Sequence, residues 1–491
     1  MPSSLDDAAL LDLAGQCLAV GLPRAELDER SADFLVEHRV RTVILFARNT
    51  PDPASTKRLT SDLQELASRS LDGPLLIAVD QEGGRVQRLR EGATRLPSAM
   101  LLGQAGPAHV RAVARVAARE LLAVGINLVL APVLDVNVEP RNAVIGNRSF
   151  GTDPEHVADC GIAAIEAYRA EGLLSCAKHF PGHGDTAVDS HRGLPSLPFD
   201  LGRLQAVELP PFLAAIRSGL DAVMAGHLAV PQLDPSGSPA TLSEPIATGL
   251  LRGRLGWLGL VCTDDLEMAG VAPSGTSAGE VAVRAMTAGC DLLFFSHTAA
   301  LAREAANALL GAVRSGGLGV ERLRRAAARV AACRARRPAA LDLEEVGSAG
   351  HRAAVEAAVK DGVRVVRPWG EEAAVALVDV DGRLADETAP PRGPVVSAAQ
   401  RRSLGTMTLD GAAASSDRGR LVVAVRRPDE RTLASIRAVA RRRPVTLIAL
   451  AEPWCLDRIP EAGAIAACDD SEAAIVRSLD LALSGGLEAG R

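Results

Sequence analysis

KHFPGHGDTAVDSH, residues 178 to 191, indicates both the fold and the site of this chain. The segment holds three histidines, two aspartates and a lysine around the turn-forming residues Pro181, Gly182 and Gly184. It follows directly on the apolar run Leu173–Ala177. A buried strand that ends in a Gly- and Pro-rich loop can hold polar groups at the mouth of a barrel or an open sheet. The alternative is a solvated loop with a capping aspartate and incidental histidines, and so dense a polar cluster favours chemistry instead.

The spacing within this segment predicts an acid–base pair. Asp189 and His191 are two residues apart, so in an extended or loop segment their side chains can project to the same side. The carboxylate could then orient the imidazole and favour its protonated form, which a proton-donating histidine needs. Lys178 and His179 come earlier, at the predicted carboxyl end of the strand, where they could hydrogen-bond a polar ligand.

Alternating apolar runs and helical segments extend from the start of the chain to about residue 300 and indicate repeated βα units. The candidate strands are Gln16–Val20, Thr42–Phe46, Leu75–Asp80, Leu128–Ala131, Ser175–His179, Ala222–Gly226, Leu260–Asp264 and Asp291–Phe295. The expected helices are Pro53–Ser68, His109–Val124, Pro154–Glu171, Leu204–Ser218, Pro245–Leu255, Ala278–Ala288 and Ala300–Ser315. This pattern is the size of a (β/α)8 TIM barrel, whose active site lies at the carboxyl ends of the strands. A doubly wound open sheet is the alternative fold.

A second domain is expected after the barrel. Val320–Arg336 is a basic, Ala-rich helix, and a linker-like segment follows it. Beyond about residue 350 helices and strands recur on a smaller scale, which predicts an α/β sandwich domain. The expected division is a barrel catalytic domain over 1–338, a linker over 339–350 and the second domain over 351–491. Val380–Ser416 is rich in Pro, Gly and Ser and could contain a long irregular connection.

Composition excludes several classes of protein. The net charge of -6, with mixed signs along the chain, gives no basic stripe, so nucleic acid is not an expected partner. Eight scattered cysteines without a CxxC pair predict reduced core thiols, with neither a disulfide framework nor a zinc site. The N-terminus lacks a secretory signal, and no apolar run approaches the roughly 20 residues of a membrane span. We expect a soluble, cytoplasmic monomer or homodimer that requires no cofactor.

Polar residues follow the predicted strands where each one ends. The set is Asp80, Asp135, Asn137, Arg148, Lys178, His179, His227, Asp264 and Asp265. Asp80 heads a loop with two glycines, where its carboxylate could accept hydrogen bonds from vicinal hydroxyls or cap the following turn. Arg148, in GNRSFG, could form a structural ion pair or grip a substrate, and spacing leaves both roles open.

Two adjacent carboxylates end the seventh predicted strand, in LGLVCTDDLEM. Neighbouring side chains of a strand point to opposite faces, so only one of them should face the barrel axis. We assign Asp264 as the nucleophile and expect Asp265 to cap the following turn or to serve as a buried hydrogen-bond partner. A carboxylate beside a protonatable group suits double displacement at an acetal carbon.

Four motifs together resemble a known enzyme family. KHFPGHGDTAVDSH, DQEGGRVQR, GNRSFG and CTDDLEM are similar to motifs of the β-N-acetylhexosaminidases of glycoside hydrolase family 3, bacterial enzymes that recycle cell-wall fragments. The resemblance covers about the first 340 residues. PVTLIALAEPW and AIAACDDSEAAIVRSLDLALSGG resemble the second domain of the family less closely.

The resemblance implies a role for each candidate residue. It implies Asp264 as nucleophile, His191 as general acid/base and Asp189 as the partner of His191. The residues that it implies for binding the terminal sugar are Asp80, Arg148, Lys178 and His179, with Arg88 as a helper. Thr263 stands where the family pattern leads us to expect serine, and His183 is interpreted as loop structure.

The implied activity is that of a retaining exo-β-N-acetylglucosaminidase acting on terminal N-acetyl-β-D-glucosamine, with peptidoglycan-derived muropeptides as substrates. Phosphorolysis is an alternative, because an imidazole acid would not repel an anionic acceptor as a carboxylate would. β-Glucosidase activity on the same barrel is another, although none of Glu371, Glu372 and Glu387 can be assigned as the glutamate acid of the larger β-glucosidases. The non-enzymatic alternative is a sugar-binding regulator descended from such enzymes.

Overall fold

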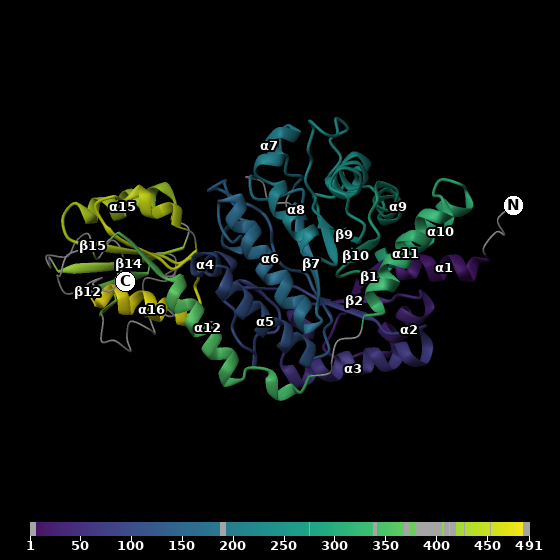
Figure 1. Ribbon diagram of the computed structural model, residues 1–491, viewed down its shortest axis with the longest axis horizontal. Helices are drawn as coiled ribbons and strands as arrows, with labels where there is room; N and C mark the ends of the chain where they lie inside the picture. The colour runs from purple at the N-terminus through teal and green to yellow at the C-terminus, as the bar shows by residue number, and fades with distance from the viewer. Residues whose placement is uncertain are drawn as a thin grey trace.

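A computed structural model describes residues 6–186, 193–273, 275–336, 341–367, 374–379, 405–406, 412, 419–426, 428–451 and 453–484. Within these residues the chain forms a closed barrel of parallel strands and a separate six-stranded sheet (Figure 1). The predicted TIM barrel followed by a smaller α/β sandwich is confirmed, and the open doubly wound sheet is excluded. The barrel positions the candidate site.

The barrel strands are β1 (Leu18–Gly21), β2 (Thr42–Leu45), β3 (Leu76–Val79), β6 (Leu128–Val129), β7 (Leu174–Phe180), β8 (Ala222–Ala225), β9 (Leu260–Asp265) and β10 (Leu292–Phe295). They pair in the closed order β1-β10-β9-β8-β7-β6-β3-β2. Every predicted barrel strand is present, with ends that differ by at most two residues. A short hairpin, β4 (Gln81–Gly83) and β5 (Val86–Gln87), follows β3.

The strands alternate between two cores, as period-two geometry requires. On β8, Ala222 and Met224 belong to the cluster that fills the barrel interior. Val223 and Ala225, from the same strand, belong to the larger cluster between strands and helices. Both faces are therefore buried, which explains why the strands read as continuous apolar runs in the sequence.

The helices around the barrel are α1 (Asp7–Gln16), α2 (Glu29–Glu37), α3 (Pro53–Ser70), α4 (Ala99–Ala105), α5 (Pro107–Ala123), α6 (Pro154–Glu171), α7 (Leu201–Ala206), α8 (Leu209–Arg217), α9 (Ala278–Ala288), α10 (Ala299–Arg314) and α11 (Val320–Arg334). Pro245–Arg254 is a π-helix, η4, within the predicted helix there. The single helix predicted over Leu204–Ser218 is wrong. The chain breaks between α7 and α8, where Pro210 and Pro211 can start a helix but cannot continue one.

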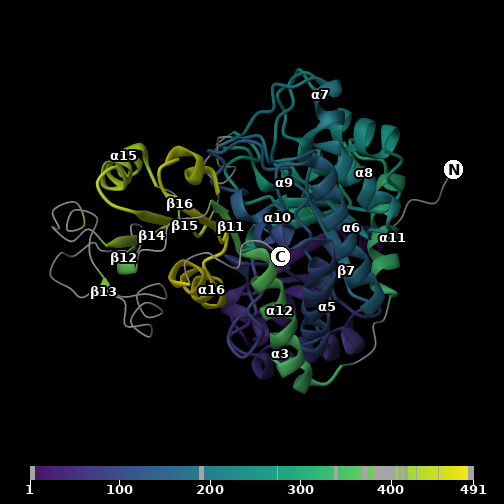
Figure 2. The same cartoon turned by 60° about the vertical axis from the view of Figure 1, so that its left-hand side comes forward.

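The second domain contains β11 (Arg364–Arg367), β12 (Ala374–Asp379), β13 (Gly405–Thr406), β14 (Arg420–Val425), β15 (Val445–Ala449) and β16 (Gly463–Ala466). Its helices are α12 (Ala349–Gly362), α15 (Glu430–Ala440) and α16 (Glu472–Leu483), with α15 and α16 on opposite sides of the sheet (Figure 1). The short strand β13 was not predicted, and most of 380–416 lies outside the described residues. Figure 2 shows α12 leading from the barrel to this domain, and α12 packs on α4, α5 and α16.

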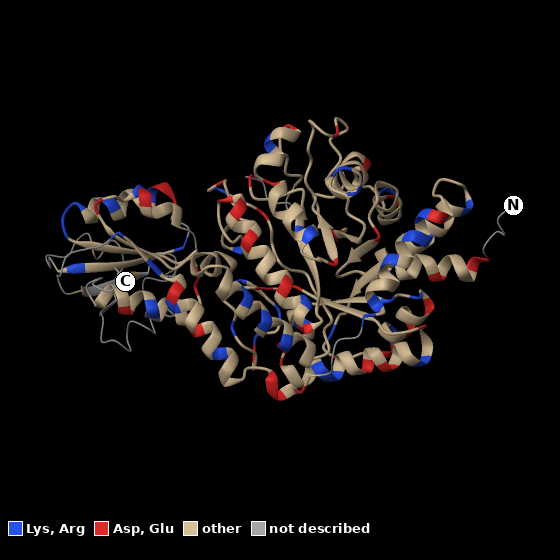
Figure 3. Cartoon of the chain, viewed as in Figure 1, with Lys and Arg blue, Asp and Glu red and all other residues tan. Residues whose placement is uncertain are grey.

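Charge and cysteine usage follow the sequence-based expectations where the structure tests them. Acidic and basic residues are intermingled over the helices (Figure 3). All eight cysteines are free, and every one except Cys333 is buried, which confirms the prediction of reduced core thiols. None of the described helices combines the length and the apolar composition that a bilayer span requires.

Candidate active site

A pocket of about 850 Å³ lies at the carboxyl ends of the barrel strands. Its walls include the predicted site residues Asp80, Arg88, Arg148, Lys178, His179 and Asp264. These residues come from β7, β9 and the loops after β3 and β6, so the barrel brings together what the sequence separates. Asp189 and His191, the predicted acid–base pair, lie outside the described residues.

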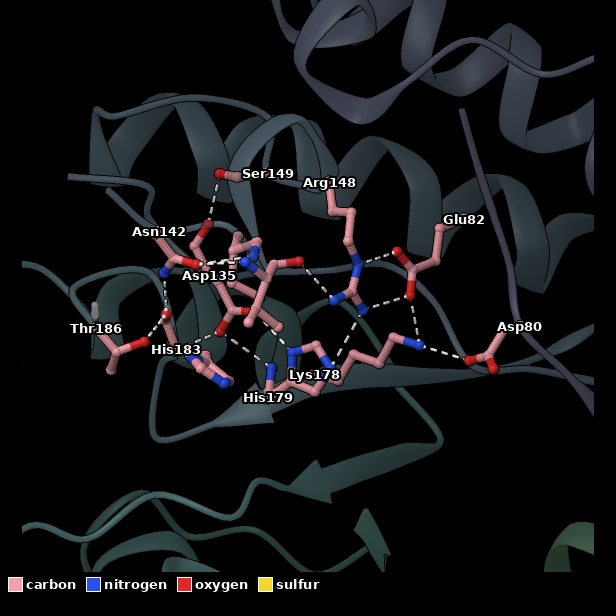
Figure 4. Close-up of polar contacts among 12 residues, drawn as sticks. Asp80, Glu82, Asp135, Asn142, Arg148, Ser149, Lys178, His179, His183 and Thr186 are labelled. Carbon is pink, nitrogen blue, oxygen red and sulfur yellow. Dashed lines mark hydrogen bonds and ion pairs between the residues drawn. The ribbon is translucent and has the colours of Figure 1, made fainter. Parts of the chain in front are cut away.

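A buried ion cluster forms one wall of the pocket (Figure 4). The Nζ of Lys178 lies 2.7 Å from Oδ1 of Asp80 and 2.7 Å from Oε1 of Glu82. Arg148 donates from Nε to Oε2 of Glu82 at 2.7 Å and from Nη2 to Oε1 at 2.8 Å. This bidentate pair and the shared lysine compensate four charges that would be costly to bury singly.

The cluster keeps its members ionised. Burial alone would raise the pKa of Asp80 and of Glu82, but the neighbouring cations outweigh burial and hold both below their usual range. Burial would lower the pKa of Lys178 and of Arg148, and the two carboxylates raise them instead. The carboxylates therefore only accept hydrogen bonds and the cations only donate them, an arrangement suited to the hydroxyls of a sugar.

Glu82 is a site residue that the sequence analysis missed. It links Lys178 to Arg148, and its side chain is only 2% exposed. The available signal was its position two residues after Asp80, in the loop that follows the third predicted strand. Arg148 does form an ion pair, which was one of its two open roles, and it also faces the pocket.

Asp135 fixes the histidines of the long motif. Its Oδ1 accepts from the backbone N of His179 at 3.1 Å and of His183 at 2.6 Å, and its Oδ2 lies 2.7 Å from Nδ1 of His179. Because the pKa of Asp135 is held low by His179 against the effect of burial, the carboxylate accepts and Nδ1 carries the proton. Nε2 of His179 lies 3.4 Å from Nη2 of Arg148.

The two carboxylates at the end of β9 have different environments. Burial opposes ionisation of Asp264, but His227 and His179 outweigh it, so the pKa of Asp264 is lowered. Burial raises the pKa of Asp265 to about 6. Oδ1 of Asp265 accepts from the backbone N of Glu267 at 3.1 Å, the turn role expected for it. The site thus favours the ionised form of Asp264 more than that of Asp265, and Asp264 lines the same pocket as the ion cluster.

His227, two residues beyond the end of β8, supports the end of β9. Its Nε2 donates to the backbone O of Asp265 at 2.9 Å, and its Nδ1 lies 2.9 Å from Oγ1 of Thr241. The ring is fully buried. His227 was predicted only as a polar residue at a strand end, and the structure shows that it holds the peptide next to the candidate nucleophile.

The start of the histidine-rich loop is tightly held. Asn142 donates from Nδ2 to the backbone O of His183 at 2.7 Å, and Nδ1 of His183 lies 2.7 Å from Oγ1 of Thr186. Gly184 packs so closely that a Cβ there would lie 1.8 Å from the O of Val136. Burial lowers the pKa of His183 to about 4, so the ring is neutral at neutral pH. His183 is also one of the residues that line the pocket, and its interpretation as loop structure stays a prediction.

Arg88 lies at the rim, where its Nη2 is 3.2 Å from Oδ2 of Asp80. Its guanidinium also lies 5.6 Å from the ring centre of Phe46, which lines the pocket. Among the described residues, no group of three or more His, Cys, Asp or Glu side chains is placed to hold a metal ion.

Comparisons with known proteins identify the family. Residues 12–333 match the glycosyl hydrolase family 3 N-terminal domain. A β-hexosaminidase of Xanthomonas oryzae pv. oryzae is 38% identical over 287 residues, which are 57% of this chain and 83% of that protein. A β-hexosaminidase of Methylococcus capsulatus is 41% identical over 283 residues, 56% of this chain and 80% of that protein.

Solved structures extend the similarity beyond the barrel. A glycoside hydrolase family 3 β-N-acetylglucosaminidase from a Paenibacillus species has a TM-score of 0.87 and 33% identity, covering 98% of this chain and 97% of that one. NagZ from Neisseria gonorrhoeae has a TM-score of 0.60 and 34% identity, covering 70% of this chain and 97% of that one. The chain therefore belongs to glycosyl hydrolase family 3 and is a glycoside hydrolase of the β-hexosaminidase type.

Proposed function

We propose that this enzyme is a retaining exo-β-N-acetylglucosaminidase, with Asp264 as nucleophile, His191 as general acid/base and Asp189 as the partner of His191. One observation carries the proposal: the carboxylate of Asp264, with its lowered pKa, lines the same pocket as the Asp80–Lys178–Glu82–Arg148 cluster. A nucleophile and a sugar-binding wall in one pocket are what displacement at an anomeric carbon requires.

In the first step a carboxylate oxygen of Asp264 attacks the anomeric carbon as the glycosidic bond breaks, and His191 gives its proton to the leaving oxygen. In the second step neutral His191 takes a proton from water, whose oxygen attacks the anomeric carbon and releases Asp264. Each displacement inverts the anomeric centre, so the product keeps the substrate configuration. Asp189 would orient the imidazole and favour its charged form before the first step and again after the second.

The terminal sugar would be held by Asp80, Arg148, Lys178 and His179, with Arg88 at the rim. Sugar hydroxyls both donate and accept, so alternating carboxylates and cations can satisfy each of them. The names of the relatives support N-acetylglucosamine as this sugar, since the Paenibacillus protein is a β-N-acetylglucosaminidase and the gonococcal NagZ structure is a complex with N-trifluoroacetyl-D-glucosamine.

We further propose that the natural substrates are peptidoglycan-derived muropeptides in the cytoplasm. The sequence motifs support this proposal through their resemblance to cell-wall-recycling enzymes. The division into a catalytic barrel over 1–338, a linker over 339–350 and a second domain over 351–491 remains our proposal for the domain boundaries.

The purified enzyme, assayed on an aryl N-acetyl-β-glucosaminide and the matching aryl β-glucoside, tests the activity. We expect much faster turnover of the N-acetylated substrate, free N-acetylglucosamine of β configuration as the first product, and no effect of added phosphate on the products. Preference for the glucoside would indicate a β-glucosidase, and a phosphate-dependent sugar 1-phosphate would indicate a phosphorylase. Binding without turnover would instead indicate a regulator.

The acid role of His191 is tested with two leaving groups. His191→Ala should slow release of a poor leaving group, such as a sugar alcohol, far more than release of a nitrophenol, because only the former needs a proton. Equal losses with both substrates would count against the assignment. Asp189→Ala should produce the same pattern with a smaller loss.

A further inference from the structure

The second domain reaches the sugar-binding wall through a buried contact. Asp469, three residues beyond the end of β16, is fully buried. Its Oδ2 accepts from the backbone N of Ser98 at 2.5 Å, and its Oδ1 accepts from the backbone N of Ser471 at 2.8 Å. The preceding carbonyl, of Cys468, accepts from Oγ of Ser98 at 2.7 Å and from Nδ2 of Asn147 at 3.5 Å. Two consecutive residues of the second domain therefore hold two barrel loops.

One of these loops leads to Arg148. Asn147 precedes it directly, and Ser98 is the N-cap of α4. Helix α4 lies against the segment that follows Arg148, because a Cβ on Gly103 would lie 1.9 Å from the backbone O of Phe150. The contact at Ser98 thus sets the position of a helix that supports the arginine of the ion cluster.

The other loop leads to Glu82. Gly84 donates from its backbone N to the O of Leu96 at 2.9 Å. A Cβ on Gly83, whose φ is 96°, would lie 2.2 Å from the O of Pro97. The hairpin that begins at Gln81 therefore rests on residues 96–98, the segment that Asp469 holds. A shift of Ser98 would move Glu82 and Arg148, the two residues of the bidentate pair.

We infer that Asp469 is a positioning residue of the second domain, which sets the Glu82–Arg148–Lys178 cluster for the terminal sugar by holding Ser98. The inference rests on the proposed function, since it takes this cluster to be the grip on the sugar. Asp469 touches no substrate and takes no part in proton transfer. It would act on substrate affinity through the geometry of the barrel loops.

Asp469→Asn tests the inference in the full-length enzyme. An amide offers one oxygen to two N–H groups, so either Ser98 or Ser471 would face an NH2 group. We expect KM for the aryl N-acetyl-β-glucosaminide, and the dissociation constant of N-acetylglucosamine by calorimetry, to rise about tenfold, with kcat changed less than threefold. A role limited to stability would lower the unfolding temperature and leave KM and sugar affinity unchanged, which would overturn the inference.

Asp429→Asn is the matched control, because Asp429 also accepts from a backbone N in the second domain, that of Thr432 at 2.7 Å, on the cap of α15. It should leave KM unchanged.

If Asp469→Asn does not fold, the test uses Asn147→Ala, which removes the contact to the Cys468 carbonyl. An unchanged KM in that variant overturns the inference. Lys178→Met in the same assay distinguishes a failure of the proposed function from a failure of the inference about Asp469. If it leaves sugar affinity intact, the proposed function fails; if it weakens affinity while Asp469→Asn does not, only this inference fails.

Discussion

The two ends of the barrel both bury carboxylates among cations, yet they differ in what the charges face. At the amino end, Asp291 is fully buried. Its two oxygens accept from Arg252 at 2.5 Å, from Arg322 and Arg329 at 3.1 Å each, and from the N of Val261 at 3.0 Å. At the carboxyl end, Asp80 and Asp264 line a pocket of about 850 Å³. At the amino end the donors occupy every acceptor position of the Asp291 carboxylate, so the ion pairs there are structural. At the carboxyl end the carboxylates border an open pocket, so they remain accessible to a bound molecule.

Asp264→Asn should give the largest effect at the carboxyl end. The amide has nearly the same size but is a poor nucleophile, so kcat on the aryl N-acetyl-β-glucosaminide should fall about 10⁴-fold. Steady-state kinetics measures this loss, and the unfolding temperature serves as the control for folding. A variant that keeps a tenth of the wild-type rate would show that another group attacks the sugar.

Asp291→Asn, at the amino end, should lower the stability of the barrel and leave catalysis nearly unchanged. It leaves three guanidinium groups without their counter-charge, and breaking a buried ion pair costs about 3–5 kcal/mol of unfolding free energy. Denaturant unfolding of the barrel measures the loss. The kcat/KM of the folded fraction should stay within about twofold of wild type, since Asp291 lies away from the chemistry. A catalytic loss without a loss of stability would erase the distinction between the two ends.

The fold was predictable because its signals are local and repeated. The barrel strands are short apolar runs, mostly buried on both faces, and polar residues at or just after the ends of β3, β7 and β9 mark the carboxyl rim. The error at Leu204–Ser218 came from reading periodicity through two consecutive prolines. Helix α4 and strand β13 were missed because they are short and owe their stability to packing rather than to their own pattern.

The site was predictable as residues but not as a network. Asp80, Arg148, Lys178 and His179 line one pocket as expected, because they follow barrel strands in order. The partners of these residues could not be predicted from spacing in the sequence. Glu82 pairs with Lys178, and Asp135 pairs with His179, and in each pair the two residues come from different parts of the chain. The link from Asp469 to Ser98 spans 371 residues of chain and has no sequence signature at all.

Lys178→Met removes the cation that Asp80 and Glu82 share and tests how much it contributes to activity. The side chain is 3% exposed, and its loss leaves Asp80 and Glu82 facing each other without the charge between them. We expect kcat/KM to fall about 100-fold, as for the loss of one well-placed charged donor in a buried site. Lys360→Met, on the exposed side of α12, is the control for losing a lysine. A variant with wild-type kcat/KM would mean that the cluster is as purely structural as the one around Asp291.

His183→Gln gives the smallest expected effect and is read from the pH dependence of stability. The folded state holds the pKa of His183 near 4, mainly because the ring is buried, while an unfolded histidine titrates near 6.5. Between these values the unfolded chain binds the extra proton, so this residue makes the protein more stable as the pH rises from 4 to 6.5. The contribution between pH 5 and pH 7 is on the order of 2 kcal/mol.

The glutamine variant should lose that slope while keeping an uncharged polar side chain beside Thr186. Urea unfolding at pH 5 and pH 7, for wild type and variant, measures it as a difference. Other titrating groups, such as Asp265 with its pKa raised to about 6, contribute equally to both proteins and cancel. An unchanged slope would mean that burial does not lower the pKa of His183 in the folded enzyme. In that case the ring would gain a positive charge beside Asp135 already below about pH 6.5, and in acid the carboxyl end of the barrel would hold one more buried cation.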